Sequence, residues 1–258
     1  MGHPLLELKN KTAVVIGGTS GIGLAIARGL AIAGANVVPT GRRAEQARTA
    51  ASVIEGLGRK SLVTTCDVTD NASVEDLLKM VCGTFGSVEI LVNCAGRTKR
   101  MPTVEVPEAD WNAILETNLT GTYRACRAFG RHMIARRYGR IINIGSLSSL
   151  VGLYEVAAYS ASKGGVASLT KALAVEWARF GVCVNALVPG VLRTDLNASL
   201  LDGTDRGREF LLRTPMHRFG QLDELAGATV FLASDAASFV TGHLLVVDGG
   251  ILASGVNQ

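Results

Sequence analysis

The segment Gly17-Gly18-Thr19-Ser20-Gly21-Ile22-Gly23 decides the fold, because it joins a β-branched run at 12–16 to a helical pattern at 22–33. Glycine lets a backbone turn sharply and approach a diphosphate closely, and the first turn of the next helix offers unpaired N–H groups to an anion. This order predicts a dinucleotide site, with a purely structural turn as the alternative. The residues expected to meet the cofactor are Gly17, Thr19, Ser20, Gly21, Ile22 and Gly23.

Strand and helix patterns alternate along the rest of the chain. Strands are expected at 12–16, 36–40, 62–66, 90–93, 140–144, 182–188 and 244–247, and helices at 22–33, 44–57, 73–85, 108–137, 157–180 and 222–234. This alternation predicts an α/β fold: a single doubly wound Rossmann-type domain spanning 1–258, with an about seven-stranded parallel sheet and helices on both faces. The long connection at 191–218 has weak periodicity and several charges, so we expect a substrate lid there.

The composition excludes several classes of protein. The chain has 258 residues and a net charge of +4, without the Lys/Arg-rich block that indicates a nucleic-acid partner. No apolar run reaches the roughly 18 residues of a membrane span. The five cysteines are scattered and form no C-x-x-C, which predicts free thiols in a reducing compartment and no metal site. We therefore expect a cytoplasmic protein that contacts neither nucleic acid nor membrane.

The second expected strand ends in Thr40-Gly41-Arg42-Arg43. An NAD site places a carboxylate near this point to accept a hydrogen bond from the ribose 2′-hydroxyl, and that acid is missing here. Arg42 and Arg43 suit a 2′-phosphate instead, because a guanidinium makes bidentate, charge-assisted hydrogen bonds. The sequence therefore favours NADP(H), with NAD(H) possible, and solvated arginines at a helix start are the alternative.

Tyr159 and Lys163 lie four residues apart, on one face of an expected helix. Free tyrosine titrates near pH 10, and a fixed cation beside it favours the phenolate, so the pair can donate and accept a proton at lower pH. Such pairs are also common in surface packing. Ser146 favours a catalytic role for the pair, because it follows the preceding strand at the edge where parallel sheets bind ligands.

These residues, taken in order, resemble the short-chain dehydrogenase/reductase family over essentially the whole chain. The resemblance rests on the glycine turn, Asp67-Val68, Asn93-Cys94-Ala95-Gly96, Asn118-Leu119-Thr120-Gly121, Ser146, Tyr159 with Lys163, Pro189-Gly190 with Thr194, and Val247-Asp248-Gly249-Gly250. Cys94 stands where the family has a second Asn. Ile16 stands where it usually has Thr, so the hydrogen bond of that Thr is lost or replaced.

The resemblance implies a role for each matched residue. Tyr159 would exchange a proton with the reacting oxygen, Ser146 would hydrogen-bond that oxygen, and Lys163 would assist Tyr159 while binding the nicotinamide ribose. Asn118 would hold a water in a proton relay. Asp67 and Val68 would border the adenine, Asn93, Ala95 and Gly96 the adenosine ribose and nearby backbone, and Pro189, Gly190 and Thr194 the nicotinamide end. The family also implies a homotetramer built on helices 119–137 and 157–180.

Three segments look most like the sugar-acid branch of the family, which includes gluconate 5-dehydrogenases: 146–156, 214–220 and 250–256. We therefore expect hydride transfer between nicotinamide and a secondary alcohol or ketone on a sugar acid or polyol. Residues expected to meet this small-molecule substrate are Arg97, Ser148, Tyr154 and Arg193, with Lys99 and Arg100 also on the cleft rim. The alternatives are a 3-oxoacyl-(acyl-carrier-protein) reductase, a glucose 1-dehydrogenase or general carbonyl reductase, and a non-catalytic cofactor-sensing protein.

Overall fold

Six short, mostly β-branched strands form one parallel sheet in a computed structural model that describes residues 3–194 and 197–255. The strands are β1 (Thr12–Ile16), β2 (Asn36–Thr40), β3 (Ile90–Asn93), β4 (Gly139–Ile144), β5 (Val182–Pro189) and β6 (Leu244–Val247), in the order β2-β1-β3-β4-β5-β6. Val14 of β1 pairs with Val38 on one side and Leu91 on the other. The chain thus leaves β1 in one direction and returns on the other side, which makes the junction of β1 and β3 the switch point where such sheets bind ligands.

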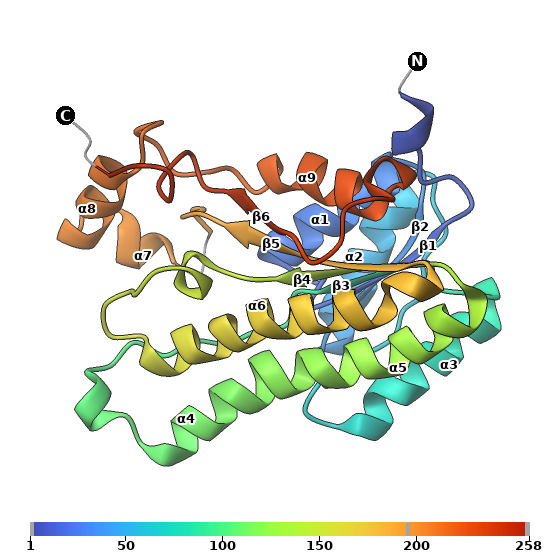
Figure 1. Cartoon of the computed structure of the whole chain (residues 1–258), viewed down its shortest axis with the longest axis horizontal. Coiled ribbons are helices and arrows are strands. Elements are labelled where there is room, and N and C mark those ends of the chain that lie inside the picture. The colour runs from blue at the N-terminus through green and yellow to red at the C-terminus, as the bar shows by residue number, and fades with distance from the viewer. Residues whose placement is uncertain (1–2, 195–196, 256–258) are drawn as a thin grey trace.

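Helices cover both faces of the sheet (Figure 1). The α-helices are α1 (Gly21–Ile32), α2 (Ala44–Gly56), α3 (Asn71–Phe85), α4 (Glu108–Leu115), α5 (Gly121–Arg136), α6 (Ala157–Trp177), α7 (Ala198–Leu201), α8 (Asp205–Arg213) and α9 (Glu224–Ala233). Shorter helical turns are η1 (Pro4–Leu6), η2 (Thr103–Glu105), η3 (Glu116–Thr120), η4 (Leu147–Ser149), η5 (Ala178–Phe180) and η6 (Asp235–Ala237).

Two hydrophobic cores follow from the alternation of side chains along each strand. Val14 and Ile16 pack on α3, α5 and α6, whereas Ala13 and Val15 pack on α1, α2 and α9. Both strand faces are therefore buried, as expected for a parallel sheet between two helical layers. The prediction of a doubly wound α/β domain is confirmed.

The expected strand at 62–66 is not part of the sheet. Val37 of β2 donates to the Lys60 carbonyl (3.2 Å) and Cys66 donates to the Gly41 carbonyl (3.0 Å), so the segment runs beside β2 but bonds to its backbone only near its ends. Donors on one side of a strand recur every second residue, and the next one after Val37 falls on Pro39, which has no N–H. The sheet therefore has six strands where about seven were expected.

The expected helix at 108–137 is also interrupted. Its middle forms η3, a single π-helical turn in which the Gly121 N–H bonds to the Glu116 carbonyl. Single π turns inside α-helices commonly occur at functional sites. This one carries Asn118, which is fully buried.

The connection at 191–218 folds into α7 and α8 at the carboxyl end of β5, on the same side of the molecule as the loop between β4 and α6 (Figure 1). Among the described residues, no helix has the length and apolar character of a membrane span. The described part of the chain also contains no cluster of three or more side chains that could hold a metal ion.

Candidate active site

The glycine turn packs directly against the end of β3. Gly17 has a φ of +81°, and a Cβ built there would lie 2.5 Å from the backbone nitrogen of Ala95. A Cβ on Gly23 would lie 2.1 Å from the Gly17 carbonyl oxygen. Only glycine fits at both positions, so the turn, α1 and β3 meet with no side chain between them. The N–H groups of Gly17 and Gly18 donate to the Thr40 carbonyl (2.8 and 3.0 Å), which fixes the turn against β2.

The first turn of α1 has no side-chain cap. Ser20 is the N-cap residue, but its hydroxyl accepts no hydrogen bond from the helix. The N–H groups of a first helical turn have no partner within their own helix, and they carry the positive end of its dipole. This end of α1 can therefore bind an anion, as the glycine pattern predicted.

Arg42 and Arg43 lie exposed between β2 and α2, and neither guanidinium forms an ion pair or hydrogen bond with the described residues. The Thr69 N–H donates to the Asp67 carboxylate (2.9 Å), and this hydrogen bond is the largest cause that lowers the pKa of Asp67. The charge of Arg42 lowers the same pKa by a smaller amount. Arg42 and Asp67 thus lie at the same end of the site. Val68 is buried against Gly121 of α5, where a Cβ would lie 2.7 Å from the valine side chain.

Asn118 joins three segments of the site through its side chain. Its amide oxygen accepts from the Arg97 N–H (2.8 Å), and its amide nitrogen donates to the Arg97 carbonyl (2.9 Å) and to the Ser162 hydroxyl (3.0 Å). Ser162 in turn donates to the Tyr159 carbonyl (2.7 Å). A Cβ on Gly96 would lie 3.5 Å from the Asn118 amide oxygen and 3.8 Å from Lys163 Nζ, so these three residues meet at one point.

Ser146 is tied to α6 through Ser149. The Ser146 N–H donates to the Ser149 hydroxyl (3.2 Å), and that hydroxyl donates to the Lys163 carbonyl (2.9 Å). The Ser146 hydroxyl accepts from the Ser148 N–H (3.2 Å), which caps the short turn η4. The loop that follows β4 is therefore held in a fixed position relative to the first two turns of α6.

Lys163 is buried, and its Nζ donates to the Ile144 carbonyl at the end of β4 (2.6 Å). The same Nζ lies 5.8 Å from the centre of the Tyr159 ring. The Tyr159 hydroxyl has no hydrogen-bond partner among the described residues, and its ring is half-buried. The structure therefore brings Asn118, Ser146, Tyr159 and Lys163 into one hydrogen-bonded frame, with the phenol hydroxyl left available.

Ser149 and Ser162 are the residues of this frame that the sequence reasoning missed. The S-x-x-S spacing of Ser146 and Ser149 was a usable signal, because a hydroxyl three residues after an N-cap Ser can complete a capping box. Ser162 had no local signal, because its partner Asn118 is 44 residues away.

Asn93 does not present its side chain to the cofactor groove. Its amide nitrogen donates to the Asn143 side chain (2.9 Å), which donates to the Thr170 hydroxyl (2.9 Å). All three residues are buried. The Asn93 side chain thus links β3, β4 and α6 inside the core, and the Asn93 backbone is the part that can border the expected adenosine ribose. Cys94 follows, and burial raises the pKa of its thiol to about 11 despite the nearby Lys163.

The expected substrate residues have differing surroundings. Arg193 is held by the Asp202 carboxylate through Nε (2.9 Å) and Nη2 (2.7 Å), so its charge is already matched. Tyr154 is 73% exposed, and the Arg97 guanidinium is exposed as well. Ser148 is buried, and its hydroxyl finds no partner within the described chain. Of the other rim cations, Lys99 pairs with Asp110 (2.6 Å) and Arg100 pairs with Glu155 (2.7 Å).

Expected nicotinamide-side residues lie at the end of β5. The Gly190 N–H donates to the Val247 carbonyl (2.8 Å), which joins Pro189-Gly190 to the end of β6. Thr194 comes four residues later, and its N–H donates to the Asn197 side chain (2.7 Å). Both positions are thus fixed at the carboxyl edge of the sheet, next to α7.

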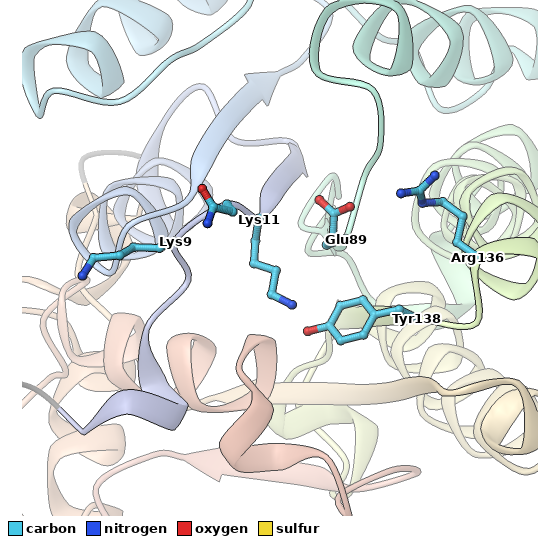
Figure 2. Close-up of a pocket in the computed structure, with 6 residues that line it drawn as sticks. Lys9, Lys11, Glu89, Arg136 and Tyr138 are labelled. Atoms are coloured by element: carbon cyan, nitrogen blue, oxygen red, sulfur yellow. The ribbon is translucent and has the colours of Figure 1, made fainter.

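A separate cavity of about 300 Å³ lies at the opposite edge of the sheet (Figure 2). Its lining residues precede β1, β3 and β4 or end α5: Lys9, Asn10, Lys11, Glu89, Arg136 and Tyr138. Lys11 Nζ lies 3.9 Å from the centre of the Tyr138 ring, and Glu89 accepts from the Thr12 N–H (2.8 Å). Because these groups lie at the amino ends of the strands, the cavity is not part of the site built on Gly17 and Ser146.

Comparison with known proteins agrees with this geometry. A family model described as "Enoyl-(Acyl carrier protein) reductase" matches residues 17–252. The gluconate 5-dehydrogenase of Gluconobacter oxydans (strain 621H) is 41% identical, with 98% of this chain and 100% of that protein covered. The 3-oxoacyl-(acyl-carrier-protein) reductase of Escherichia coli (strain K12) is 39% identical, with coverages of 95% and 99%.

A solved structure shows the same fold. A gluconate 5-dehydrogenase from Burkholderia cenocepacia J2315, crystallised in complex with NADP and tartrate, has a TM-score of 0.94 and 40% identity, covering 97% of this chain and 98% of that one. The chain therefore belongs to the short-chain dehydrogenase/reductase family and is an NAD(P)-dependent oxidoreductase that acts on CH–OH groups.

Proposed function

We propose that this enzyme interconverts a secondary alcohol and a ketone on a sugar acid or polyol, with NADP(H) as the favoured cofactor and NAD(H) possible. The observation that carries the proposal is the frame that holds Ser146, Tyr159, Lys163 and Asn118 together and leaves the Tyr159 hydroxyl free. A protein that only sensed its cofactor would have no use for a proton donor positioned in this way.

The residues present fit a dinucleotide. The open space beside Gly21, where a Cβ would meet nothing within 4 Å, and the uncapped start of α1 suit a diphosphate. Arg42 and Arg43 would hold a 2′-phosphate, since they are exposed, cationic and free of ion pairs with the described residues. Asp67, Val68, Ala95 and Gly96 would line the adenosine half, and Pro189, Gly190 and Thr194 the nicotinamide half. NADP is bound in the Burkholderia cenocepacia relative, which supports the same choice here.

Four side chains divide the proton chemistry. A nicotinamide bound here supplies the hydride for ketone reduction and accepts it in alcohol oxidation. The Tyr159 hydroxyl gives its proton to the reacting oxygen, or takes one from it, and the Ser146 hydroxyl donates a hydrogen bond to that oxygen. Lys163 favours the phenolate by its charge, and the two ammonium protons not used by Ile144 can bind a ribose.

Asn118 can serve as the outer end of a proton relay. Its backbone carbonyl accepts from the Thr122 hydroxyl (2.7 Å), and we propose that the same carbonyl also accepts from a water. The π turn η3 supports this role, because it changes the helical bonding pattern at this residue.

The substrate class is inferred from the relatives and from charge. The Gluconobacter oxydans relative is a gluconate 5-dehydrogenase, and tartrate, another hydroxylated carboxylic acid, occupies the Burkholderia cenocepacia structure. On the rim of this chain, Arg97 can attract an anion because its guanidinium is exposed. Tyr154, which is exposed, is the proposed partner of a substrate hydroxyl. The Ser148 hydroxyl is buried, so it would contact the substrate only after a shift of η4. Arg193 contributes mainly by holding the 191–218 segment, which we propose to act as a lid.

A 3-oxoacyl-(acyl-carrier-protein) reductase is the second candidate. It is favoured by one observation, the 39% identity to the Escherichia coli reductase over nearly the same length. Its acidic carrier protein would need a basic docking surface, which the exposed Arg136 and Arg137 could begin to form.

We further propose a cytoplasmic homotetramer. All five cysteines are free, as suits a reducing compartment. Phe239 and Val175 are 101% and 84% exposed in the single chain, and a neighbouring subunit would cover such apolar surface. A mass near four times 27.0 kDa in light scattering would support the tetramer, and a monomeric mass at micromolar concentration would exclude it.

A spectrophotometric assay at 340 nm tests the proposed function. NADPH and NADH are each paired with 5-ketogluconate and an acetoacetyl thioester, and the oxidised cofactors with gluconate and glucose. Turnover of ketogluconate or gluconate is the expected result. Turnover of the thioester alone would establish a 3-oxoacyl-(acyl-carrier-protein) reductase, and turnover of glucose alone would establish a glucose dehydrogenase. Cofactor binding with no turnover would instead favour a non-catalytic cofactor-sensing protein.

A further inference from the structure

The 191–218 segment contains five arginines, and four of them are ion-paired. Arg193 pairs with Asp202, Arg208 with Asp205, Arg213 with Glu209, and Arg218 with Glu224. The fifth, Arg206, forms no ion pair with any carboxylate of residues 3–194 and 197–255. Among the described residues of this segment, Arg206 is therefore the arginine without a carboxylate partner.

Arg206 lies where three segments of the rim converge. It belongs to α8, and the charges of Arg100 and Glu155 both act on it. Arg100 comes from the loop after β3, and Glu155 comes from the loop between Ser146 and Tyr159. These two loops are fastened to each other by the Arg100–Glu155 ion pair (2.7 Å) and by the Met101 N–H, which donates to the Glu155 carbonyl (2.9 Å).

The position of Arg206 is unfavourable for a cation without an anionic partner. Its side chain is half-buried, and desolvation followed by repulsion from Arg100 lowers its pKa. Glu155 and Glu209 both attract the Arg206 charge, but the Glu155 carboxylate is already engaged by Arg100 and the Glu209 carboxylate by Arg213. Arg206 also lies in the first turn of α8, where the helix dipole disfavours positive charge. Local stability therefore does not account for an arginine here, whereas an anion that binds beside it would offset each of these costs.

The side chain is also restrained. Its guanidinium lies 5.3 Å from the centre of the Phe210 ring, one turn later on α8. The start of the helix is fixed by Thr204, whose hydroxyl accepts from the Gly207 N–H (3.0 Å). A restrained guanidinium loses less freedom when it binds a carboxylate, and its planar fork matches both oxygens.

Together these features place an arginine that has no ion pair within the described residues near the loop that leads into Tyr159. Glu155 is four residues before Tyr159 in the chain, so the two backbones are at most about 15 Å apart. An extended sugar acid of five or six carbons covers only part of that distance between its reacting carbon and its carboxylate, so the long Tyr159 and Arg206 side chains would cover the rest.

We propose that Arg206 binds the carboxylate of the substrate and so selects acidic sugars over neutral polyols. This inference rests on the proposed function and extends it, because it assigns the acidic end of the substrate to a lid residue.

The test compares two ligands that differ only at one end. D-gluconate carries a carboxylate, and D-glucitol carries a neutral hydroxymethyl group in its place. Their dissociation constants are measured by calorimetry on the full-length enzyme saturated with NADPH, where no reaction occurs because ligand and cofactor are both reduced. Arg206→Gln keeps a polar stem over Phe210, Arg206→Lys keeps the charge, and Arg213→Gln removes the same charge from the far end of α8.

Arg206→Gln should weaken gluconate binding by about 10- to 100-fold and leave glucitol binding within about twofold of the wild type. Arg206→Lys should recover much of the gluconate affinity, and Arg213→Gln should change neither ligand appreciably. Equal losses in Arg206→Gln and Arg213→Gln, an unchanged gluconate affinity, or a wild type that does not prefer gluconate would each overturn the proposal.

This outcome is separate from that of the proposed function. If gluconate binds through Arg206 but no sugar acid is turned over in the assay at 340 nm, the proposed reaction is wrong and the binding role stands. If sugar acids are turned over while Arg206→Gln binds gluconate normally, the reaction stands and the binding role is wrong.

Discussion

Replacing Gly17 with alanine should destabilise the protein without any cofactor present. Two costs add at this position. An L-residue at a φ of +81° costs about 1–2 kcal/mol, and a Cβ placed 2.5 Å from the Ala95 backbone nitrogen forces a shift of the kind that costs about 1–3 kcal/mol. We therefore expect the free energy of unfolding to fall by about 2–5 kcal/mol.

Gly21→Ala is the matched control, because Gly21 belongs to the same turn and has a φ of +50°, but a Cβ there meets nothing within 4 Å. Its expected cost is the conformational one alone, about 1–2 kcal/mol. Urea unfolding of the two variants, monitored by circular dichroism with no nucleotide added, separates the clash from the backbone strain.

The result that would refute this reasoning is equal loss of stability in the two variants. It would mean that the contact between the turn and β3 is not tight, and that the glycine at position 17 serves the bound cofactor alone. An unstable Gly17→Ala variant with normal NADPH affinity would show that the end of β3 moves to relieve the clash while the glycine turn keeps its conformation.

Three further predictions concern the cofactor, the frame and the core. Arg42→Ala should weaken NADPH by about tenfold or more while NADH changes little, measured by fluorescence titration; equal weakening would show that Arg42 does not read the 2′-phosphate. Ser149→Ala should lower kcat by about tenfold with an unchanged dissociation constant for NADPH, because it breaks the link between Ser146 and Lys163; unaltered kcat would make that link dispensable. Burial raises the pKa of Cys126 to about 12 from an ordinary value of 9.0, so the unfolded chain ionises first and stability is lost as pH rises from about 9 toward 12. Between pH 8 and pH 10 the wild type should lose about 1 kcal/mol more than Cys126→Ala in urea titrations, and parallel losses would contradict the assignment.

Local sequence patterns predicted the strands well because β1 to β5 are buried on both faces, and β6 is partly buried. The β-branched runs at 12–16, 36–40, 90–93 and 244–247 coincide with strands β1, β2, β3 and β6. The run at 62–66 has the same composition, but whether it joins the sheet depends on its neighbour, where Pro39 lacks a donor. The pattern of residue types within one segment does not show which hydrogen-bonding groups the neighbouring segment offers.

The same limit applies to the site. The glycine turn and the Tyr159–Lys163 spacing are local, and they could be read directly. The π turn at Asn118 could not, and neither could the side-chain bonds of Asn118 to Arg97 and Ser162, which lie far away in sequence. The family motif places Asn93 beside the adenosine ribose, but it could not show that the Asn93 side chain donates to Asn143, which in turn donates to Thr170 in the core.

Arg206 shows a third kind of limit. The sequence of 191–218 contains five arginines with similar neighbours, and no spacing rule predicts which of them lacks an ion pair. Only the folded chain shows which arginines have found a carboxylate and which one faces Arg100 and Glu155 instead.

The central claim is that Tyr159 exchanges the proton with the substrate, and one substitution tests it most directly. Tyr159→Phe removes the hydroxyl and keeps the ring beside Lys163. The account predicts that kcat with the best substrate of the assay falls by about 100-fold or more, while the dissociation constant for NADPH stays within about twofold of the wild type. Near-normal turnover by Tyr159→Phe would contradict the account.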